Sequence, residues 1–121
     1  MRSLAVSSVL ALSLCACAAD EPVDVYMRAC NDTGSDITDL TYHWLYSTPA
    51  LAAGACTEYV HSTKAVPYDP HVVFTIASAN FLNRGEDVVG TSVIESGRWT
   101  YRLTIYDADR SIAHVEAVAD E

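Results

Sequence analysis

Basic residues are scarce in this 121-residue chain. Seven lysines and arginines stand against sixteen aspartates and glutamates, which gives a formal net charge of −9 at pH 7. Nucleic-acid binding draws on clustered basic side chains, and so does docking of a protein surface onto anionic lipid headgroups. The composition argues against both. The acidity serves solubility outside the cell, or it attracts cations or a basic partner.

Glycine-rich and nucleophile motifs are also missing. The five glycines form neither G-x-G-x-x-G nor a P-loop, and no serine lies in a G-x-S-x-G pattern. The sequence therefore shows no phosphate cradle of a nucleotide-binding protein and no nucleophile elbow of a serine hydrolase. Because no catalytic constellation emerges, we expect a non-enzymatic protein without a cofactor.

The amino-terminal segment has the pattern of an export signal. Arg2 supplies one positive charge, residues 4–14 form an uncharged apolar run, and small residues follow up to the first acid, Asp20. A charged start, an apolar run of about ten residues and a small-residue exit are typical of secretory signal peptides. The run is shorter than the roughly 20 apolar residues that span a bilayer. A buried amino-terminal helix is the alternative, but the run has no polar face.

The end of this segment resembles the lipobox of bacterial lipoproteins. Leu14-Cys15-Ala16-Cys17 places a leucine, a tolerant position and a small residue before a cysteine. The resemblance implies that the Cys17 thiol carries a lipid with acyl chains such as palmitate, and that cleavage makes Cys17 the first residue. Ala18 stands where an aspartate often marks inner-membrane retention, which favours the outer membrane. The alternative is ordinary cleavage at Ala16-Cys17-Ala18, which gives a soluble secreted protein.

This interpretation divides the chain into three parts. Residues 1–16 are the lipoprotein signal peptide, residues 17–24 are a lipidated tether, and residues 25–121 are the folded domain. Removal of residues 1–16 also removes Arg2, so six basic and sixteen acidic residues remain and the formal charge becomes −10.

Two cysteines remain in the folded domain, Cys30 and Cys56. An exported chain passes through an oxidising compartment, where an even pair of cysteines predicts a disulfide. Zinc is the alternative, but two cysteines without a C-x-x-C or a nearby histidine pair have poor ligand spacing. We therefore predict a Cys30–Cys56 disulfide, worth about 3.5 kcal/mol from chain entropy.

Apolar and polar residues alternate with period two through the domain, and helical periodicity is nearly absent. The clearest hairpin has its turn at Asp107 to Arg110. Six or seven short strands bounded by turn residues predict an all-β domain, a small antiparallel β-sandwich, with a small barrel as the alternative. The predicted strands cover residues 23–30, 37–46, 55–62, 71–79, 99–106 and 112–118, with a further short strand around 88–94 and chain breaks at Thr48-Pro49 and Ala53-Gly54.

Three short blocks of the domain resemble small bacterial lipoproteins that have no assigned activity. The resemblance supports the β-fold and the envelope location, and it implies no chemistry. The blocks are Cys30-Asn31-Asp32-x-Gly34, Ala53-Gly54-x-Cys56-Thr57-Glu58-Tyr59 and Gly97-Arg98-Trp99-Thr100-Tyr101.

Aromatic residues are the candidate binding surface. Tyr42, Trp44 and Tyr46 share one face of a predicted strand, and Trp99 and Tyr101 share a face of another. Large aromatics commonly fill a core, which is one interpretation. The other is an exposed aromatic platform for a partner protein or a glycan. A domain of this size cannot easily bury both groups, so we expect some exposure.

Histidines and paired carboxylates give weaker indications. The four histidines lie on different predicted strands with no two at metal-ligand spacing, so we expect surface or packing roles and no metal. An acidic pair beside the predicted hairpin turn has part of a calcium-loop pattern, but no glycine or distal glutamate completes it. We interpret these carboxylates as turn residues. The residues concerned are His43, His61, His71, His114, Glu86, Asp87, Asp107 and Asp109.

Together these patterns predict a non-enzymatic, membrane-anchored lipoprotein of the bacterial cell envelope. Its β-domain is expected to bind or support another envelope component, a protein or a glycan, while the lipid on Cys17 contacts the membrane. The alternative is a small periplasmic inhibitor of a basic hydrolase such as lysozyme, which the acidic charge would attract. An enzyme or a metal carrier ranks last.

Overall fold

Strands are the regular elements throughout the part of the chain that the computed structural model describes, residues 22–42, 46–83 and 93–120, and no helix occurs there. The all-β prediction is therefore confirmed. The strands are β1 (Asp24–Asn31), β2 (Ile37–Tyr42), β3 (Tyr46–Leu51), β4 (Val60–Ser62), β5 (Val66–Pro67), β6 (Val72–Ile76), β7 (Ala79–Asn83), β8 (Val93–Ile94), β9 (Ser96–Asp107) and β10 (Ile112–Ala119).

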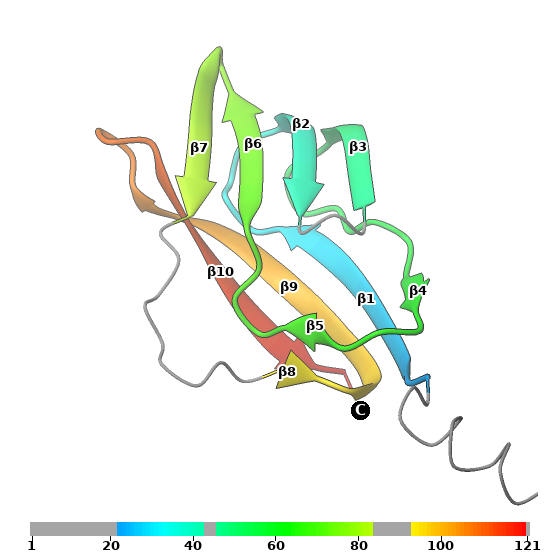
Figure 1. Ribbon diagram of the computed structural model, residues 1–121. Coiled ribbons are helices and arrows are strands. Elements are labelled where there is room, and N and C mark those ends of the chain that lie inside the picture. The colour runs from blue at the N-terminus through cyan, green and yellow to red at the C-terminus, as the bar shows by residue number, and fades with distance from the viewer. Residues whose placement is uncertain (1–21, 43–45, 84–92, 121) are drawn as a thin grey trace, which may run out of the picture.

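Eight of these strands form one continuous sheet in the order β3-β2-β6-β7-β10-β9-β1-β4, and β5 pairs with β8 in a small second sheet. The large sheet is folded over so that β3, β2, β6 and β7 lie across β10, β9 and β1, and it curves nearly into a barrel (Figure 1). The predicted antiparallel sandwich of six or seven strands was wrong in two respects. The main sheet is single, and it contains two parallel pairs, β1 with β9 and β7 with β10.

The hairpin predicted from the last third of the sequence is confirmed. Strands β9 and β10 pair antiparallel, from Asp107 opposite Ile112 to Trp99 opposite Ala119. The register shifts between Ile112 and Ala113, and Ser111 in the turn has a φ of 58°. A turn of this kind followed by a bulge commonly connects the strands of a hairpin whose loop is longer than two residues.

The strand predicted over residues 37–46 is instead a hairpin. Strand β2 ends at Tyr42, β3 begins at Tyr46, and these two residues face each other across an antiparallel pair. The break predicted at Thr48-Pro49 is also wrong, because both residues lie within β3. Proline lacks an amide hydrogen, but β3 is an edge strand of the sheet, where one amide needs no partner.

Two other predicted strands have different limits in the structure. Over residues 55–62 only β4 is a strand, together with an isolated bridge between Cys30 and Cys56. Residues 71–79 contain β6, after which Ala77 and Ser78 adopt positive φ values of 48° and 73° and turn the chain into β7. Strand β8 confirms the end of the short strand expected around 88–94, whose earlier residues lie outside the described chain.

The core lies between the two crossing halves of the folded sheet. Tyr42 of β2 packs edge-on against Tyr101 of β9 at a ring-centroid distance of 5.6 Å. Three strands, β6, β7 and β10, lie between β2 and β9 in the sheet order, so the contact is made across the fold of the sheet. Phe74 and Phe81 stack at 5.6 Å on the adjoining hairpin. The other fully buried apolar residues of the described chain are Val25, Met27, Ala29, Ile37, Leu40, Val66, Val72, Ile94 and Leu103.

The segment that follows β3 runs along the carboxyl-terminal half of β1 and is bonded to it. The predicted disulfide between Cys30 and Cys56 is confirmed. Backbone hydrogen bonds flank it, from the Asn31 amide to the Ala55 carbonyl and from the Thr57 amide to the Ala29 carbonyl, both at 2.8 Å.

The side chain of Asn31 ties the same corner together. It is fully buried, and its amide donates to the carbonyls of Ser35 at 2.7 Å and Leu51 at 2.9 Å. Its oxygen accepts hydrogen bonds from the amide and the hydroxyl of Thr33. Every polar atom of this buried side chain is therefore bonded, as burial requires.

We predict that removing the disulfide destabilises the domain by about 3.5 kcal/mol, because the unfolded chain regains the entropy of a closed loop. The two cysteines are 26 residues apart in the sequence. The test is urea unfolding of the Cys30→Ala, Cys56→Ala double variant against the oxidised protein. The reduced wild type serves as control and should behave as the variant does. An unchanged unfolding midpoint would show that the disulfide is not a restraint on the chain.

We also predict that two buried tyrosines respond differently to the loss of a hydroxyl. The Tyr101 hydroxyl donates to the Pro67 carbonyl at 2.6 Å, whereas the buried Tyr42 hydroxyl makes no hydrogen bond of good geometry among the described residues and has only a weak interaction with Thr57. Burial raises the pKa of Tyr42 to about 12. Tyr101→Phe should lower the free energy of unfolding by about 1–3 kcal/mol, because the Pro67 carbonyl loses its hydrogen-bond donor. Tyr42→Phe should leave the free energy of unfolding unchanged or raise it. Equal losses of unfolding free energy in the two variants would contradict this.

Candidate functional site

The four described aromatic residues of the predicted binding platform, Tyr42, Tyr46, Trp99 and Tyr101, do not share an exposed surface. Tyr42 and Tyr101 are fully buried, so neither is available to a partner. Tyr46 is half-buried against the core, and Trp44 lies outside the described residues. The half-buried Trp99 donates its indole N–H to the Ser96 carbonyl at 2.8 Å. The core interpretation of these groups is thus correct for the two buried tyrosines.

A different set of side chains gathers on the outer face of β4, β1 and β9. We call it the arginine–tyrosine cluster. Alternation along β1 buries Val25 and Met27 and turns Tyr26 and Arg28 outward. The parallel register then sets Tyr26 beside Arg98 and Arg28 beside Thr100. The cluster consists of Tyr26, Arg28, Tyr59, His61, Arg98, Thr100 and Asp120.

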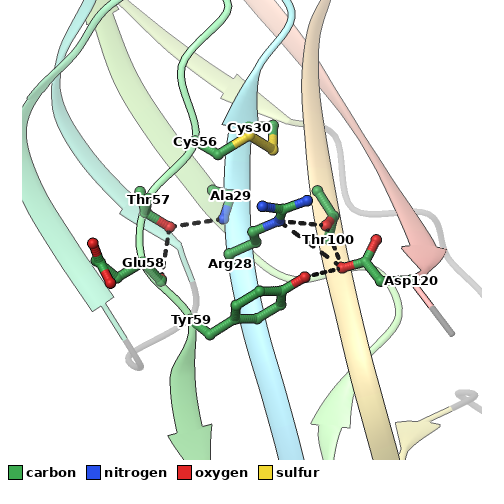
Figure 2. A network of polar contacts seen from close by, with 9 residues as sticks. All are labelled: Arg28, Ala29, Cys30, Cys56, Thr57, Glu58, Tyr59, Thr100 and Asp120. Atoms are coloured by element: carbon green, nitrogen blue, oxygen red, sulfur yellow. Dashed lines mark hydrogen bonds and ion pairs between the residues drawn. A yellow bond between two sulfur atoms is a disulfide. The ribbon is translucent and has the colours of Figure 1, made fainter.

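Three side chains of the cluster, Tyr59, Thr100 and Arg28, converge on the carboxylate of Asp120 (Figure 2). Its Oδ2 accepts a hydrogen bond from the Tyr59 hydroxyl at 2.6 Å and another from the Thr100 hydroxyl at 2.7 Å. The Nε atom of Arg28 lies 3.9 Å from the same oxygen and donates to the Thr100 hydroxyl at 2.9 Å. Groups from β1, β9 and the segment before β4 therefore converge on one carboxylate oxygen.

These contacts determine which groups carry charge. Desolvation alone would raise the pKa of Asp120, but the hydrogen bonds from Tyr59 and Thr100 and the nearby arginines outweigh it and lower that pKa. The hydrogen bond to Asp120 is the main reason why the pKa of Tyr59 is raised. The carboxylate is accordingly ionised and the tyrosine keeps its proton at neutral pH.

The aromatic rings of the cluster are held by cations. The guanidinium carbon of Arg28 lies 4.9 Å from the Tyr59 ring centroid, and that of Arg98 lies 5.3 Å from it. The Tyr26 ring stacks on His61 at 4.7 Å, and His61 Nε2 lies 2.8 Å from the Asp24 carboxylate. Such contacts fix the side chains in one arrangement while leaving the face accessible.

This face also carries a third arginine. Arg102 follows on the same side of β9 and pairs with Asp32 at 2.6 Å. A protein with a formal charge of −9 thus places Arg28, Arg98 and Arg102 along one outer surface. This face of an acidic molecule therefore combines arginine and tyrosine side chains with the carboxylates of Asp24, Asp32 and Asp120.

The remaining sequence candidates are dispersed. His71 and His114 are exposed on separate segments, and in the described ranges no three histidine, cysteine, aspartate or glutamate residues are grouped to hold a metal ion. Asp107 accepts a hydrogen bond from the Arg110 amide at 3.3 Å, as a turn residue does. The residues that fall outside the described chain are Cys17, His43, Glu86 and Asp87.

Within the described ranges, no helix has the length and apolarity needed to cross a bilayer.

Sequence reasoning did not identify the cluster. Its members come from positions 26 to 120, and Arg28 and Thr100, which bond to each other, are 72 residues apart. The available signal was the polar face of two alternating runs, Tyr26 and Arg28 in one and Arg98 and Thr100 in the other. Nothing in the sequence pattern indicated that these runs pair in parallel.

Comparisons with known proteins show the fold and no more. No protein-family model matches the chain, and no curated protein matches its sequence. An NMR structure of a protein from Eubacterium rectale is similar, with a TM-score of 0.51 and 14% sequence identity, over 81% of this chain and 89% of that one. At this identity the similarity extends to the fold alone.

We predict that Asp120→Asn destabilises the domain by on the order of 1 kcal/mol at pH 7, because the charge-assisted hydrogen bonds weaken. The pKa of Asp120 is lowered in the folded state, so its contribution is full above the unfolded-state pKa of about 3.9 and disappears as the pH falls through the folded value. Urea unfolding of both proteins at pH 7, 5 and 3 measures the difference. A difference that stays constant down to pH 3 would contradict the assignment.

Proposed function

We propose that this protein is a non-enzymatic lipoprotein of the bacterial cell envelope, and that its β-domain binds another envelope component through the arginine–tyrosine cluster. Anchoring is through a lipid on Cys17. The observation that carries the proposal is the gathering of arginine and tyrosine side chains on one outer face of an acidic domain. Within this proposal, Ala18 favours the outer membrane over the inner.

Arginine and tyrosine suit such a surface for physical reasons. Both are enriched among the residues that contribute most to protein–protein affinity, since each offers a large contact area together with hydrogen-bond donors. In the cluster their conformations are already restricted by stacking and hydrogen bonds. Binding of a partner therefore costs less free energy, because these side chains are already ordered.

The short tether supports action close to a membrane. Residues 17–23 separate the predicted lipid from the start of β1, and seven extended residues reach about 25 Å at most. Strands β5 and β8 lie near the same end of the molecule as the start of β1 (Figure 1). A domain anchored in this way would stay close to the membrane, and its partner would have to lie there too.

Site-specific crosslinking tests the proposal. A photoreactive phenylalanine analogue at Tyr26 keeps an aromatic ring in the cluster, and the same analogue at Tyr106 is the control. These residues are 37% and 65% exposed, so the control is the more accessible position. We expect a discrete crosslinked product in intact cells from position 26 and none from position 106. Products from position 106 alone, or from neither position, would contradict binding through the cluster.

A second candidate function is inhibition of a basic hydrolase such as lysozyme. The observation in its favour is the negative charge, with Asp36, Asp39, Glu58, Glu95 and Asp109 all exposed. Opposite charges would steer the two proteins together. A lysozyme activity assay separates the candidates, because an envelope-binding protein should leave the enzyme unaffected at every ratio tested.

A further inference from the structure

We propose that the arginine–tyrosine cluster is a carboxylate-binding site in which Asp120 is the resident ligand, and that an aspartate or glutamate side chain of a protein partner takes its place. The identity of that partner rests on the proposed function. The carboxylate chemistry does not, because it belongs to the isolated domain.

The donors of this site are built into the sheet. The Tyr59 and Thr100 hydroxyls both point at Asp120 Oδ2, at 2.6 and 2.7 Å. Arg28 supports this geometry, since its Nε donates to the Thr100 hydroxyl and lies 3.9 Å from the same oxygen (Figure 2). Two hydroxyl donors backed by a guanidinium are the groups that recognise a carboxylate.

The acceptor, by contrast, comes from the end of a strand. Strand β10 ends at Ala119, and the Asp120 amide adds one last backbone hydrogen bond, to the Arg98 carbonyl at 2.8 Å. Strand ends open at a lower free-energy cost than strand centres. The Asp120 side chain retains 22% of its accessible surface, so solvent and solutes reach it. Exchange would leave the donor groups in place.

The arginines beside Asp120 favour a carboxylate at the position that it occupies. Arg28 and Arg98 both lower the pKa of Asp120, so both guanidinium groups stabilise a charged carboxylate at this position. The molecule as a whole carries a formal charge of −9, so an anion is stabilised mainly where arginines and hydroxyl donors lie together. An acidic side chain of a partner would therefore be stabilised by the same groups that hold Asp120. Asp120 competes at the high effective concentration of an intramolecular group, commonly in the millimolar range, so a partner needs additional contacts nearby.

A matched control exists on the same surface. Asp32 pairs with Arg102 at 2.6 Å and holds one guanidinium. Asp32→Ala thus releases an arginine without opening the hydroxyl pair of Tyr59 and Thr100. Asp120→Ala releases an arginine together with those two donors.

The experiment is an acetate titration of the purified domain at constant ionic strength, followed by NMR at the Thr100 and Arg98 amides. We expect saturable shifts in Asp120→Ala, with an affinity at least tenfold higher than in the wild type, and no saturation at these amides in Asp32→Ala. Adding Thr100→Val to Asp120→Ala should weaken acetate binding at least fivefold. If Asp120→Ala does not fold, Asp120→Ser, whose short side chain also leaves the carboxylate position open, takes its place with the same order expected.

Shifts that do not saturate, or equal affinities in the Asp120 variant and the wild type, would overturn the proposal. The titration contains no partner, so a negative result leaves the crosslinking test of the proposed function unaffected. A crosslink from Tyr26 without acetate binding would assign the cluster to a partner that it recognises by other contacts.

Discussion

The parallel pairing of β1 with β9 is the constraint on which the rest of this structure depends. Eight consecutive residue pairs, from Asp24 with Ser96 to Asn31 with Leu103, join segments about seventy residues apart. Because side chains alternate across a sheet, this one register buries Met27 on the inner face and aligns Arg28 with Thr100 on the outer face. The core and the arginine–tyrosine cluster are thus two consequences of the same pairing.

That pairing needs support at the far end of β1, where β4 no longer covers it. The disulfide and the segment around Ala55 supply a covalent and hydrogen-bonded edge there. Asn31 adds a buried amide whose donors and acceptor are all bonded to the neighbouring loops. A small domain has a limited core, so such restraints provide a large share of its stability. These bonds hold the segment after β3 against the carboxyl-terminal end of β1.

Local patterns predicted what depends on near neighbours. Alternation from Trp99 to Ile105 and a turn at Asp107 were sufficient for the last hairpin, and two cysteines in a chain predicted to be exported were sufficient for the disulfide. Alternation could not show that Tyr42 and Tyr46 lie on opposite arms of a hairpin, since both arms continue the same period. It also could not distinguish an exposed aromatic face from a buried one. The cluster escaped prediction because parallel pairing between distant strands leaves no short-range signal.

The central claim is that a lipid holds this domain at a bacterial membrane, where the outer face of β1 and β9 meets an envelope partner. Mass spectrometry of the mature protein from its native envelope tests that claim most directly. The account predicts a first residue of Cys17 carrying diacylglycerol, together with a mass deficit of about 2 Da for the disulfide between the two remaining cysteines. An unmodified amino terminus at Ala19 or Asp20 would contradict it.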